Sequence, residues 1–465
     1  MSTTHEAGWA HAPGALRGPS WLQPPRDVNA LVPQLWSATA QKVDGDLVVG
    51  GVPVADLVAD HNTPAHVLDE EDFRARARAF KEAFSGWDVY YAGKAFLCTA
   101  VARWIAEEGL CLDVCSDGEL TVALRAGFEP ARIGYHGNNK SVAELRRAVA
   151  AGVGRIIVDS FQEIERLEMI TRDTGLRARV MVRVTAGVEA HTHEYIATAH
   201  EDQKFGLSIT SGDAFEAVRR LSAVEGIDLL GLHSHIGSQI FDASGFEVAA
   251  RRVLALHARV SDELGVTMPE MDLGGGFGIA YTTQDDPSDP AQLATEMGKI
   301  VEHECRALGV DEPRLSIEPG RAIVGPAMCT VYTVGTVKPV ALDAGAVRTY
   351  VSVDGGMSDN IRTALYDADY SCTLAGRASD AAPVLSRVVG KHCEAGDIVV
   401  RDEFLPADVA PGDLLAVPGT GAYCRSMASN YNHALRPPVI AVRDGVARVV
   451  VRRETEDDLL ATDVG

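Results

Sequence analysis

Two groups of residues in the sequence have types and spacing suited to catalysis, and the first is a lysine after an apolar run. Lys94 ends the stretch WDVYYAGK (residues 87–94), which is rich in aromatic and β-branched residues and therefore predicts a strand. A lysine held by a rigid strand between buried neighbours can lose its proton and attack a carbonyl carbon. The stretch alone leaves open the alternative that Lys94 points into solvent.

The second group is a glycine run and a glutamate further along the chain. Gly274, Gly275 and Gly276 follow a predicted strand, and bare backbone N–H groups of this kind commonly hold a phosphate. A phosphate beside a strand-end lysine indicates a phosphorylated sugar or pyridoxal phosphate. Glu318 favours pyridoxal phosphate, because a carboxylate that faces the ring nitrogen stabilises the protonated ring. Pairing of Glu318 with Arg321 is the alternative.

These residues all lie at the C-terminal ends of predicted strands. The predicted strands are residues 87–93, 110–114, 132–135, 155–159, 179–184, 227–233, 269–273 and 314–318. Helices are predicted at 70–84, 97–108, 117–127, 141–151, 161–174, 213–224, 246–264 and 290–308. Apolar strands that alternate with helices predict an α/β fold with a parallel sheet, and eight such units predict a closed (β/α)8 TIM barrel. A doubly wound open sheet stays open as an alternative, because this rhythm does not show closure.

The sequence predicts two domains in 465 residues. The (β/α)8 barrel, expected to bind pyridoxal phosphate, occupies 65–324. A mainly β domain follows at 325–465, with a hairpin turn at Asp444-Gly445. The segment 28–64 is too short to fold alone and is expected to complete the β domain, whereas residues 1–27 are expected to form a partly disordered arm.

Composition excludes several classes of protein. The net charge of −22 repels phosphate backbones, so nucleic acid is not an expected partner. No run of 18 apolar residues occurs, and the N-terminus lacks the features of a signal peptide, so we expect no membrane association and a cytoplasmic location. The eight cysteines lack paired motifs and are expected to be reduced.

Histidines raise a metal alternative. His233 and His235 in HSHIGSQ (233–239) alternate along a strand and are expected on opposite faces. With HTH at 191–193 they leave a zinc hydrolase open as an alternative. A flat imidazole against a cofactor ring suits the site better, and no metal is expected. The connection 185–206 is expected to form a lid.

Several motifs together closely resemble those of the diaminopimelate decarboxylases, which are pyridoxal-phosphate enzymes of the alanine-racemase-like (fold type III) class. The resemblance covers about residues 30 to 455. The motifs are YAGK (91–94), DVCSDGE (113–119), HGNNKS (136–141), KFG (204–206), HSHIGSQ, DLGGGFG, EPGR (318–321), GKHCEAGD (390–397) and GAYCRSMASNYN (421–432). The resemblance implies decarboxylation of meso-2,6-diaminopimelate to L-lysine and CO2, the last step of lysine biosynthesis by the diaminopimelate pathway.

The resemblance also implies roles for individual residues. Lys94 holds the cofactor covalently, His235 stacks on its ring and Glu318 pairs with the ring nitrogen. The phosphate or its surroundings are served by Ser238, Gly276 with the neighbouring Gly274 and Gly275, and Tyr423; Arg321 lies beside the cofactor. The substrate is bound by Arg321, Arg362, Tyr366, Glu394 and Tyr423. Cys393 donates the proton that replaces CO2, and Cys393 and Glu394 extend into the active site of the partner in a homodimer.

The substrate has independent physical support. Meso-diaminopimelate carries a second carboxylate, which ornithine lacks, and guanidinium groups such as those of Arg321 and Arg362 bind carboxylates in a two-pronged manner. Three departures from the family pattern, Ala199, Ala395 and Arg425, affect only the lid and local contacts. Decarboxylases of ornithine, arginine or carboxynorspermidine, an alanine-racemase-type enzyme and a non-enzymatic pyridoxal-phosphate carrier remain as alternatives.

Overall fold

The protein is described from a computed structural model, which covers residues 18–187, 204–342 and 346–465. The described chain divides into two compact units. The barrel unit comprises Arg74–Gly278 and Pro287–Ile323, and the β unit comprises the described residues up to Phe73, with Ile279–Asp286 and Val324–Gly465. The HTH at 191–193, Ala199, most of the expected lid (185–206) and most of the expected arm (1–27) lie outside the described residues.

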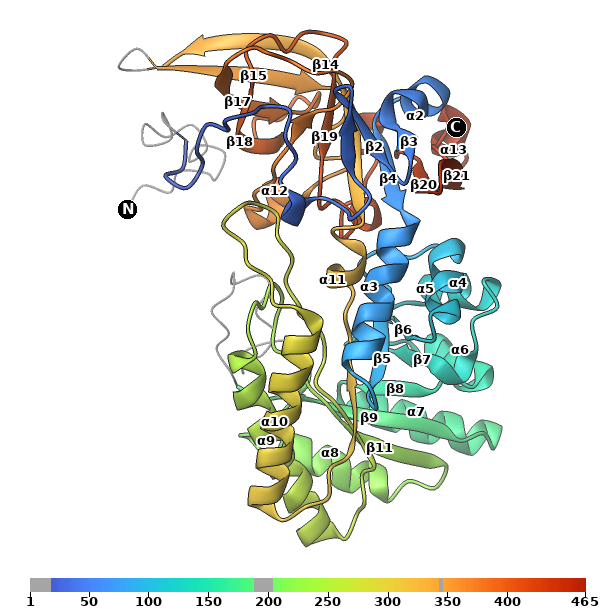
Figure 1. Ribbon diagram of the computed structural model, residues 1–465. Helices are drawn as coiled ribbons and strands as arrows, with labels where there is room; N and C mark the ends of the chain where they lie inside the picture. The colour runs from blue at the N-terminus through green and yellow to red at the C-terminus, as the bar shows by residue number, and fades with distance from the viewer. Residues whose placement is uncertain (1–17, 188–203, 343–345) are drawn as a thin grey trace, which may run out of the picture. The chain divides into compact units, whose positions relative to one another are not determined.

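The barrel unit contains parallel strands (Figure 1), and their pairing forms a closed ring. Its strands are β5 (Asp88–Ala92), β6 (Cys111–Val114), β7 (Ile133–Tyr135), β8 (Arg155–Val158), β9 (Ala178–Thr185), β11 (Ile227–His233), β12 (Glu270–Asp272) and β13 (Arg314–Ile317). Each strand pairs in parallel with its neighbour, and the pairing of β8 with β9 closes the ring. The short β10 (Leu207–Ser208) adds to β9. The predicted TIM barrel is confirmed, and the open sheet is excluded.

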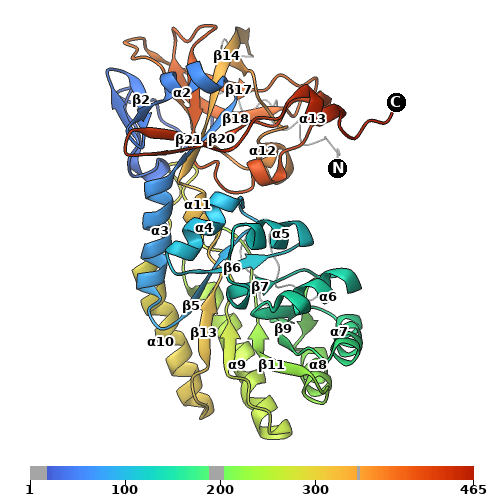
Figure 2. The same cartoon turned by 90° about the vertical axis from the view of Figure 1, so that its right-hand side faces the viewer.

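Helices surround this ring of strands (Figure 2). They are α3 (Glu70–Ala83), α4 (Thr99–Glu107), α5 (Asp117–Arg125), α6 (Val142–Ala151), α7 (Phe161–Thr174), α8 (Asp213–Ser222), α9 (Ser244–Leu264) and α10 (Pro290–Leu308). The short α11 (Arg321–Val324) follows β13. Local sequence sets several of the ends. Ser141 and Glu144 form a capping box that starts α6, and Gly152 ends this helix in the left-handed conformation.

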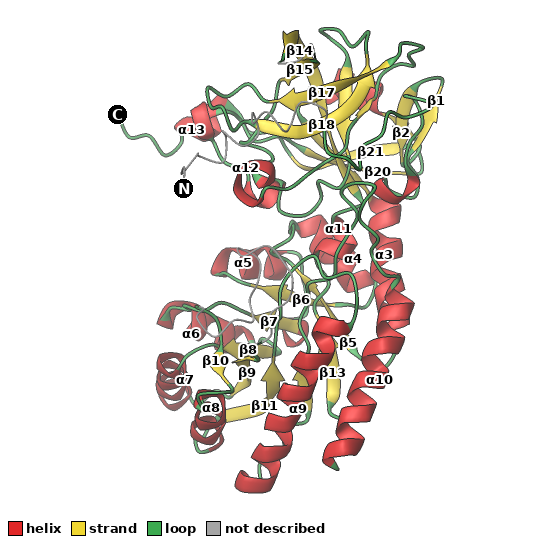
Figure 3. Ribbon diagram, turned by 90° about the vertical axis from the view of Figure 1, so that its left-hand side faces the viewer, coloured by secondary structure: helices red, strands yellow, loops and turns green. Residues whose placement is uncertain are grey.

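The β unit consists mainly of strands (Figure 3). Its strands are β1 (Gln41–Val43), β2 (Asp46–Val49), β3 (Val52–Pro53), β4 (Ala65–Asp69), β14 (Met328–Ala341), β15 (Val347–Val353), β16 (Thr373–Leu374), β17 (Pro383–Val389), β18 (Ile398–Pro406), β19 (Leu414–Val417), β20 (Val439–Arg443) and β21 (Val446–Val451). Its helices are α2 (Val54–His61), α12 (Arg362–Tyr366) and α13 (Glu456–Leu460). The hairpin predicted at Asp444-Gly445 joins β20 to β21, and both turn residues have positive φ.

Early residues contribute to the core of the β unit. Leu47, Val49 and Leu57 pack in one apolar cluster with Val331 and Ile440. β4 pairs with β14 and β20, so the barrel boundary expected at residue 65 needs correction. The sequence pattern of an apolar strand followed by a helix is the same for a strand of either unit. Only the strands to which β4 is hydrogen-bonded show which sheet it belongs to.

Within the described residues, no helix has both the length and the apolar character needed to cross a membrane.

Candidate active site

Lys94 lies two residues beyond the end of β5 at the mouth of the barrel. A side chain at the preceding residue, Gly93, would come within 2.7 Å of the carbonyl oxygen of Asp113, so this turn requires glycine. Lys94 influences the titration of groups at the barrel mouth: burial lowers the pKa of His235, and the charge of Lys94 lowers it further. Lys94 itself is exposed, as the solvent-facing alternative expects, and it is also electrostatically coupled to His235.

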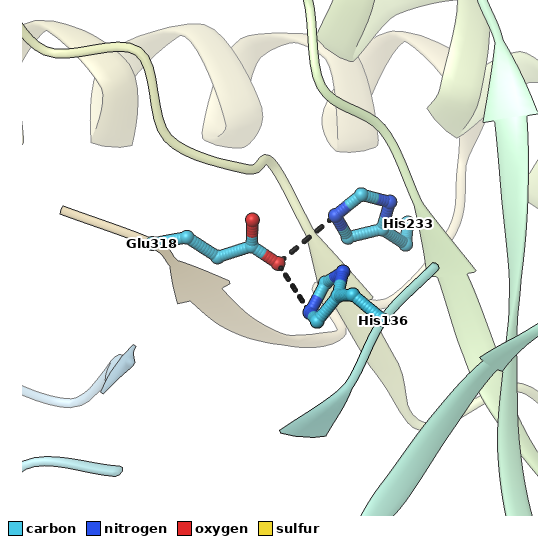
Figure 4. Close-up of side chains that lie close together, drawn as sticks. All are labelled: His136, His233 and Glu318. Atoms are coloured by element: carbon cyan, nitrogen blue, oxygen red, sulfur yellow. Dashed lines mark hydrogen bonds and ion pairs between the residues drawn. The ribbon is translucent and has the colours of Figure 1, made fainter. Parts of the chain in front are cut away.

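Glu318 lies directly after β13 and is 5% exposed. Its Oε1 atom accepts a hydrogen bond from His233 Nε2 at 2.9 Å and lies 3.2 Å from His136 Nε2 (Figure 4). Burial alone would raise the pKa of Glu318, but His136 and His233 outweigh burial and hold this pKa well below its usual range. The result is a buried carboxylate that stays ionised and has one oxygen engaged by two imidazoles.

A second carboxyl group, that of Asp113 at the end of β6, lies close to the same histidine. Its Oδ1 atom is 3.2 Å from His136 Nε2. Burial and the nearby charge of Glu318 raise the pKa of Asp113 well above its usual range. Two carboxyl groups thus share one imidazole with opposite shifts, so Glu318 holds the negative charge and Asp113 the proton.

A buried arginine lies among the same strands. Arg155 on β8 forms an ion pair with Asp272 and donates to Ser316 Oγ at 2.9 Å. Its guanidinium lies 3.6 Å from the ring centroid of Tyr90. Asp272 in turn accepts a hydrogen bond from the Gly274 backbone N–H at 2.6 Å. Arg155 therefore fixes the start of the glycine run.

The glycine run itself packs too closely for side chains. A Cβ atom at Gly276, which has φ of +107°, would lie 2.5 Å from the carbonyl oxygen of Gly237. A Cβ atom at Gly275 would collide with the carbonyl oxygen of Glu318. Bare backbone is therefore required here, as a phosphate cradle needs.

His235 contacts this glycine run, because its Nδ1 atom accepts a hydrogen bond from the Gly275 N–H at 3.2 Å. The expectation that His233 and His235 face opposite sides of the sheet is wrong. β11 ends at His233, so the alternation of a strand does not extend to His235. Both imidazoles belong to the group of side chains around Glu318.

Arg321 bonds to a hydroxyl rather than to the neighbouring carboxylate. Its Nη2 atom donates to Ser238 Oγ at 2.8 Å. The alternative that Glu318 pairs with Arg321 is therefore not what the structure shows. Glu318 Oε1 instead binds His233 and lies close to His136. Ser238 and Arg321 together present a polar group beside the glycine run.

Arg362 in the β unit is a buried cation that contacts two tyrosines. It is 5% exposed, and Nη1 donates to the Tyr370 hydroxyl at 2.6 Å. The guanidinium lies 4.6 Å from the ring centroid of Tyr281. Among the residues that the structure describes, no carboxylate pairs with Arg362, and its Nε atom has no hydrogen-bond partner. Tyr366 shares the short helix α12 and is partly exposed.

The remaining predicted site residues lie on loops of the β unit. Cys393 and Glu394 are exposed in the loop between β17 and β18. Tyr423 is partly exposed and has a φ of +64°, which is unusual for a bulky residue. Of the departures from the family pattern that the structure describes, Ala395 is exposed and Arg425 lies in a short 3-10 turn.

Three functional candidates were not assigned by sequence reasoning: His136, Asp113 and Arg155. The first two lie at the ends of β7 and β6, where barrel active sites are built, and that position was their only signal. The ligand atoms of His136, His233 and Glu318 lie within 4.8 Å of one another, a spacing that suits a metal ion. The zinc alternative therefore has a donor set, but with His136 in place of the second histidine of the HSH motif.

The residues present fit pyridoxal phosphate. The ionised Glu318 matches a protonated ring nitrogen, the glycine run matches a phosphate, and Lys94 supplies the amine that a carbonyl group needs. A zinc hydrolase would use only the histidines and the glutamate. Pyridoxal phosphate uses all three features.

Comparison with known proteins agrees with this fit. Residues 70–325 match the family model described as pyridoxal-dependent decarboxylase, pyridoxal binding domain. Diaminopimelate decarboxylase of Mycobacterium tuberculosis is 57% identical over 440 residues, with 93% of this chain and 98% of the relative covered. The Bacillus subtilis enzyme of the same name is 44% identical, with 92% and 98% covered. The crystal structure of diaminopimelate decarboxylase from M. jannaschii with L-lysine has a TM-score of 0.86 and 30% identity, with 92% and 98% covered.

Proposed function

The chain belongs to the diaminopimelate decarboxylases, a family of pyridoxal-dependent decarboxylases, and from this membership we propose how its own residues perform the reaction. It decarboxylates meso-diaminopimelate to L-lysine and CO2 with pyridoxal 5'-phosphate as cofactor. The observation that carries the proposal for the site is the buried, ionised Glu318 with two imidazoles on one oxygen. The second oxygen is the natural partner for a protonated ring nitrogen.

Bound pyridoxal phosphate supplies a protonated ring that accepts the electron pair released as CO2 leaves. Lys94 would hold it covalently through Nζ, and His235 would lie against its ring. Gly276, Ser238 and Arg321 would bind the phosphate side, where bare backbone, a hydroxyl and a guanidinium are available.

Glu318 and its neighbours divide the charges of the site. His136 is neutral, because burial lowers its pKa to about 4. His233 donates to Glu318 Oε1, and the uncharged His136 ring lies 3.2 Å from the same oxygen without neutralising it, so the carboxylate keeps its charge for the ring nitrogen. Burial and the charge of Glu318 raise the pKa of Asp113 well above its usual range, which disfavours a second negative charge beside Glu318.

Arg362 would bind the carboxylate at the far end of the substrate. A guanidinium that is buried without an ionic partner gains most from a ligand that supplies one. Tyr366 and Glu394 would complete this end of the site, Glu394 by accepting from the distal ammonium group. Ornithine lacks the distal carboxylate and would leave Arg362 unpaired.

Cys393 would hold the proton that replaces CO2, and Tyr423 would lie beside the phosphate. The exposure of Cys393 and Glu394 supports their insertion into a second copy of the chain, so the active unit would be a homodimer. None of the eight cysteines, all within the described residues, forms a disulfide, which is typical of proteins in a reducing compartment and supports a cytoplasmic location.

Complementation tests the shared site. Lys94→Ala and Cys393→Ala are each expected to have low activity, whereas a mixture unfolded and refolded together should recover part of it in mixed dimers. Recovery requires that one chain supply Lys94 and the other Cys393. A mixture no more active than the parent variants would contradict the shared site.

The proposed substrate is tested by CO2 release. The purified holoenzyme should release CO2 from meso-diaminopimelate and far less from ornithine or arginine. Equal rates with ornithine would contradict the role of Arg362. A protein that carries stoichiometric zinc and no visible cofactor absorbance would contradict the cofactor assignment.

A further inference from the structure

The loop that carries Cys393 and Glu394 is held by a buried carboxylate that has no assigned role. Asp397 closes this loop and is 3% exposed, whereas Cys393 and Glu394, four and three residues before it, are exposed. The loop contains no helix or strand of its own, because β17 ends at Val389 and β18 starts at Ile398. Its conformation therefore depends on turn hydrogen bonds and on side chains that bind its backbone.

Both oxygens of Asp397 accept backbone hydrogen bonds from different segments. Oδ2 accepts from the His392 N–H at 2.8 Å, within the loop, and Oδ1 accepts from the Met357 N–H at 2.6 Å. Backbone bonds strengthen the same connection: the Gly390 N–H donates to the Asp397 carbonyl at 2.9 Å, and the Lys391 N–H donates to the Gly355 carbonyl at 3.0 Å. The carboxylate thus ties the loop to the turn at 355–358.

Two glycines make room for this carboxylate. A Cβ atom at Gly356 would lie 2.5 Å from Asp397 Oδ1, and one at Gly390 would collide with Oδ2. Gly356 also has a φ of +152°, which disfavours a side chain. Since both positions must be bare for Asp397 to fit, the two glycines and the carboxylate form one packed unit.

His392 extends the same connection to a third segment. Its Nε2 atom lies 2.8 Å from Ser358 Oγ, and its Nδ1 atom lies 3.0 Å from Asn432 Oδ1. The Ser429 N–H also donates to the Ser358 carbonyl at 2.9 Å. The turn at 355–358 leads directly into α12 with Arg362, and the segment 421–432 carries Tyr423. One polar cluster therefore joins the three segments of the β unit that carry proposed site residues.

We propose that Asp397 is a positioning residue for the reaction, which fixes the backbone that presents Cys393 and Glu394 and ties it to the segments of Arg362 and Tyr423. This inference rests on the proposed roles of Cys393 and Glu394. Asp397 acts through these residues and touches neither substrate nor cofactor.

Two substitutions test the positioning role of Asp397 in different ways. Asp397→Asn keeps the shape but leaves one backbone N–H facing an amide NH2 group, because an amide has a single carbonyl oxygen. Gly390→Ala keeps the carboxylate and displaces it. Asp413→Asn is the matched control: Asp413 belongs to the same unit and accepts from the Ala410 N–H at 2.9 Å, away from the three segments.

The holoenzyme of each variant is compared with wild type in three measurements. They are kcat and KM for meso-diaminopimelate, the visible absorbance of the cofactor, and the rate of alkylation of Cys393 by iodoacetamide, followed by peptide mass spectrometry. Asp397→Asn and Gly390→Ala should lower kcat by about tenfold or more, since displacement of a reacting group by about 1 Å costs about that much or more. They should speed alkylation of Cys393 several-fold and leave cofactor absorbance unchanged.

Asp413→Asn should lower the thermal midpoint at most and keep wild-type kcat and alkylation. The proposal is overturned when both Asp397→Asn and Gly390→Ala behave like Asp413→Asn. If Asp397→Asn fails to fold, Gly390→Ala decides alone. A Cys393→Ala variant distinguishes failure of the proton-donor role of Cys393 from failure of the positioning role of Asp397. If Cys393→Ala keeps wild-type kcat, the proton-donor role is refuted. The alkylation rates of Cys393 in the other variants then test the positioning role of Asp397 without reference to kcat.

Discussion

Replacement of Arg362 by methionine should lower activity on meso-diaminopimelate and leave the stability of the protein nearly unchanged. Methionine keeps most of the apolar stem and removes the guanidinium. In kcat/KM for meso-diaminopimelate, loss of a buried charge pair costs about 2–5 kcal/mol, which is about 30-fold to several thousand-fold. The loss should be absent with D-lysine, which has the same reacting centre and chain length but lacks the distal carboxylate.

Stability should change little in the same variant, and the contacts of Arg362 show why. Replacing a buried ion by an apolar side chain is neutral or stabilising by about 1–4 kcal/mol. Loss of the hydrogen bond to Tyr370 costs about 1 kcal/mol, and loss of the contact with Tyr281 costs up to about 2 kcal/mol. These contributions nearly cancel, so the free energy of unfolding should stay within about 2 kcal/mol of wild type.

The assay is CO2 release from both substrates, together with urea unfolding of each protein. The matched control is Arg377→Met, because Arg377 already has a carboxylate partner: its Nε and Nη2 donate to Asp413 at 2.8 and 2.7 Å. That variant should lose stability and keep the ratio of the two substrates. If Arg362→Met lowered kcat/KM equally for meso-diaminopimelate and D-lysine, its specificity role would be refuted.

Four further predictions concern the cofactor, the proton and pH. Lys94→Ala should abolish the visible absorbance of the purified protein, and a full remaining signal would contradict covalent attachment there. Cys393→Ala should slow CO2 release at least tenfold, in the range of general acid catalysis, and keep the cofactor absorbance; loss of cofactor would count against its role. Glu318→Gln should lower kcat by about 100-fold or more, because the ring nitrogen loses its ionised partner, and unchanged turnover in a steady-state assay would exclude that pairing. Burial lowers the pKa of His66 to about 3, so between pH 6.5 and 3 the unfolded chain binds a proton that the folded chain does not. As the pH is lowered through that window, the free energy of unfolding should therefore decrease by up to about 1.4 kcal/mol per pH unit, as measured by urea unfolding. The decrease should be less steep in His66→Asn; the same slope in both proteins would contradict this.

The barrel was predictable because its signals are local. Most barrel strands are short runs dominated by apolar residues, and the residues that start and end helices, such as Ser141 with Glu144 and Gly152, lie within a few positions of each other. Membership of β4 in the other sheet was not predictable, since it depends on hydrogen bonds to β14 and β20, which are distant in sequence.

The sequence could indicate which residues lie near one another in the site, but not which of them form hydrogen bonds or ion pairs with each other. Position at strand ends brought Lys94, Glu318 and the glycine run into one prediction. The partner of Glu318 was beyond reach, because the choice between Arg321 and the histidines depends on side-chain directions after the strands end. The alternation rule failed at His235 for the same reason, since β11 stops two residues earlier.

The central claim is that Lys94 holds pyridoxal phosphate covalently in a decarboxylase of meso-diaminopimelate. Borohydride reduction of the holoenzyme fixes such a linkage permanently, and digestion with peptide mass spectrometry then locates it. We expect the cofactor on the peptide that contains Lys94 and on no other lysine. Cofactor found on a different lysine, or none retained after reduction, would contradict the account.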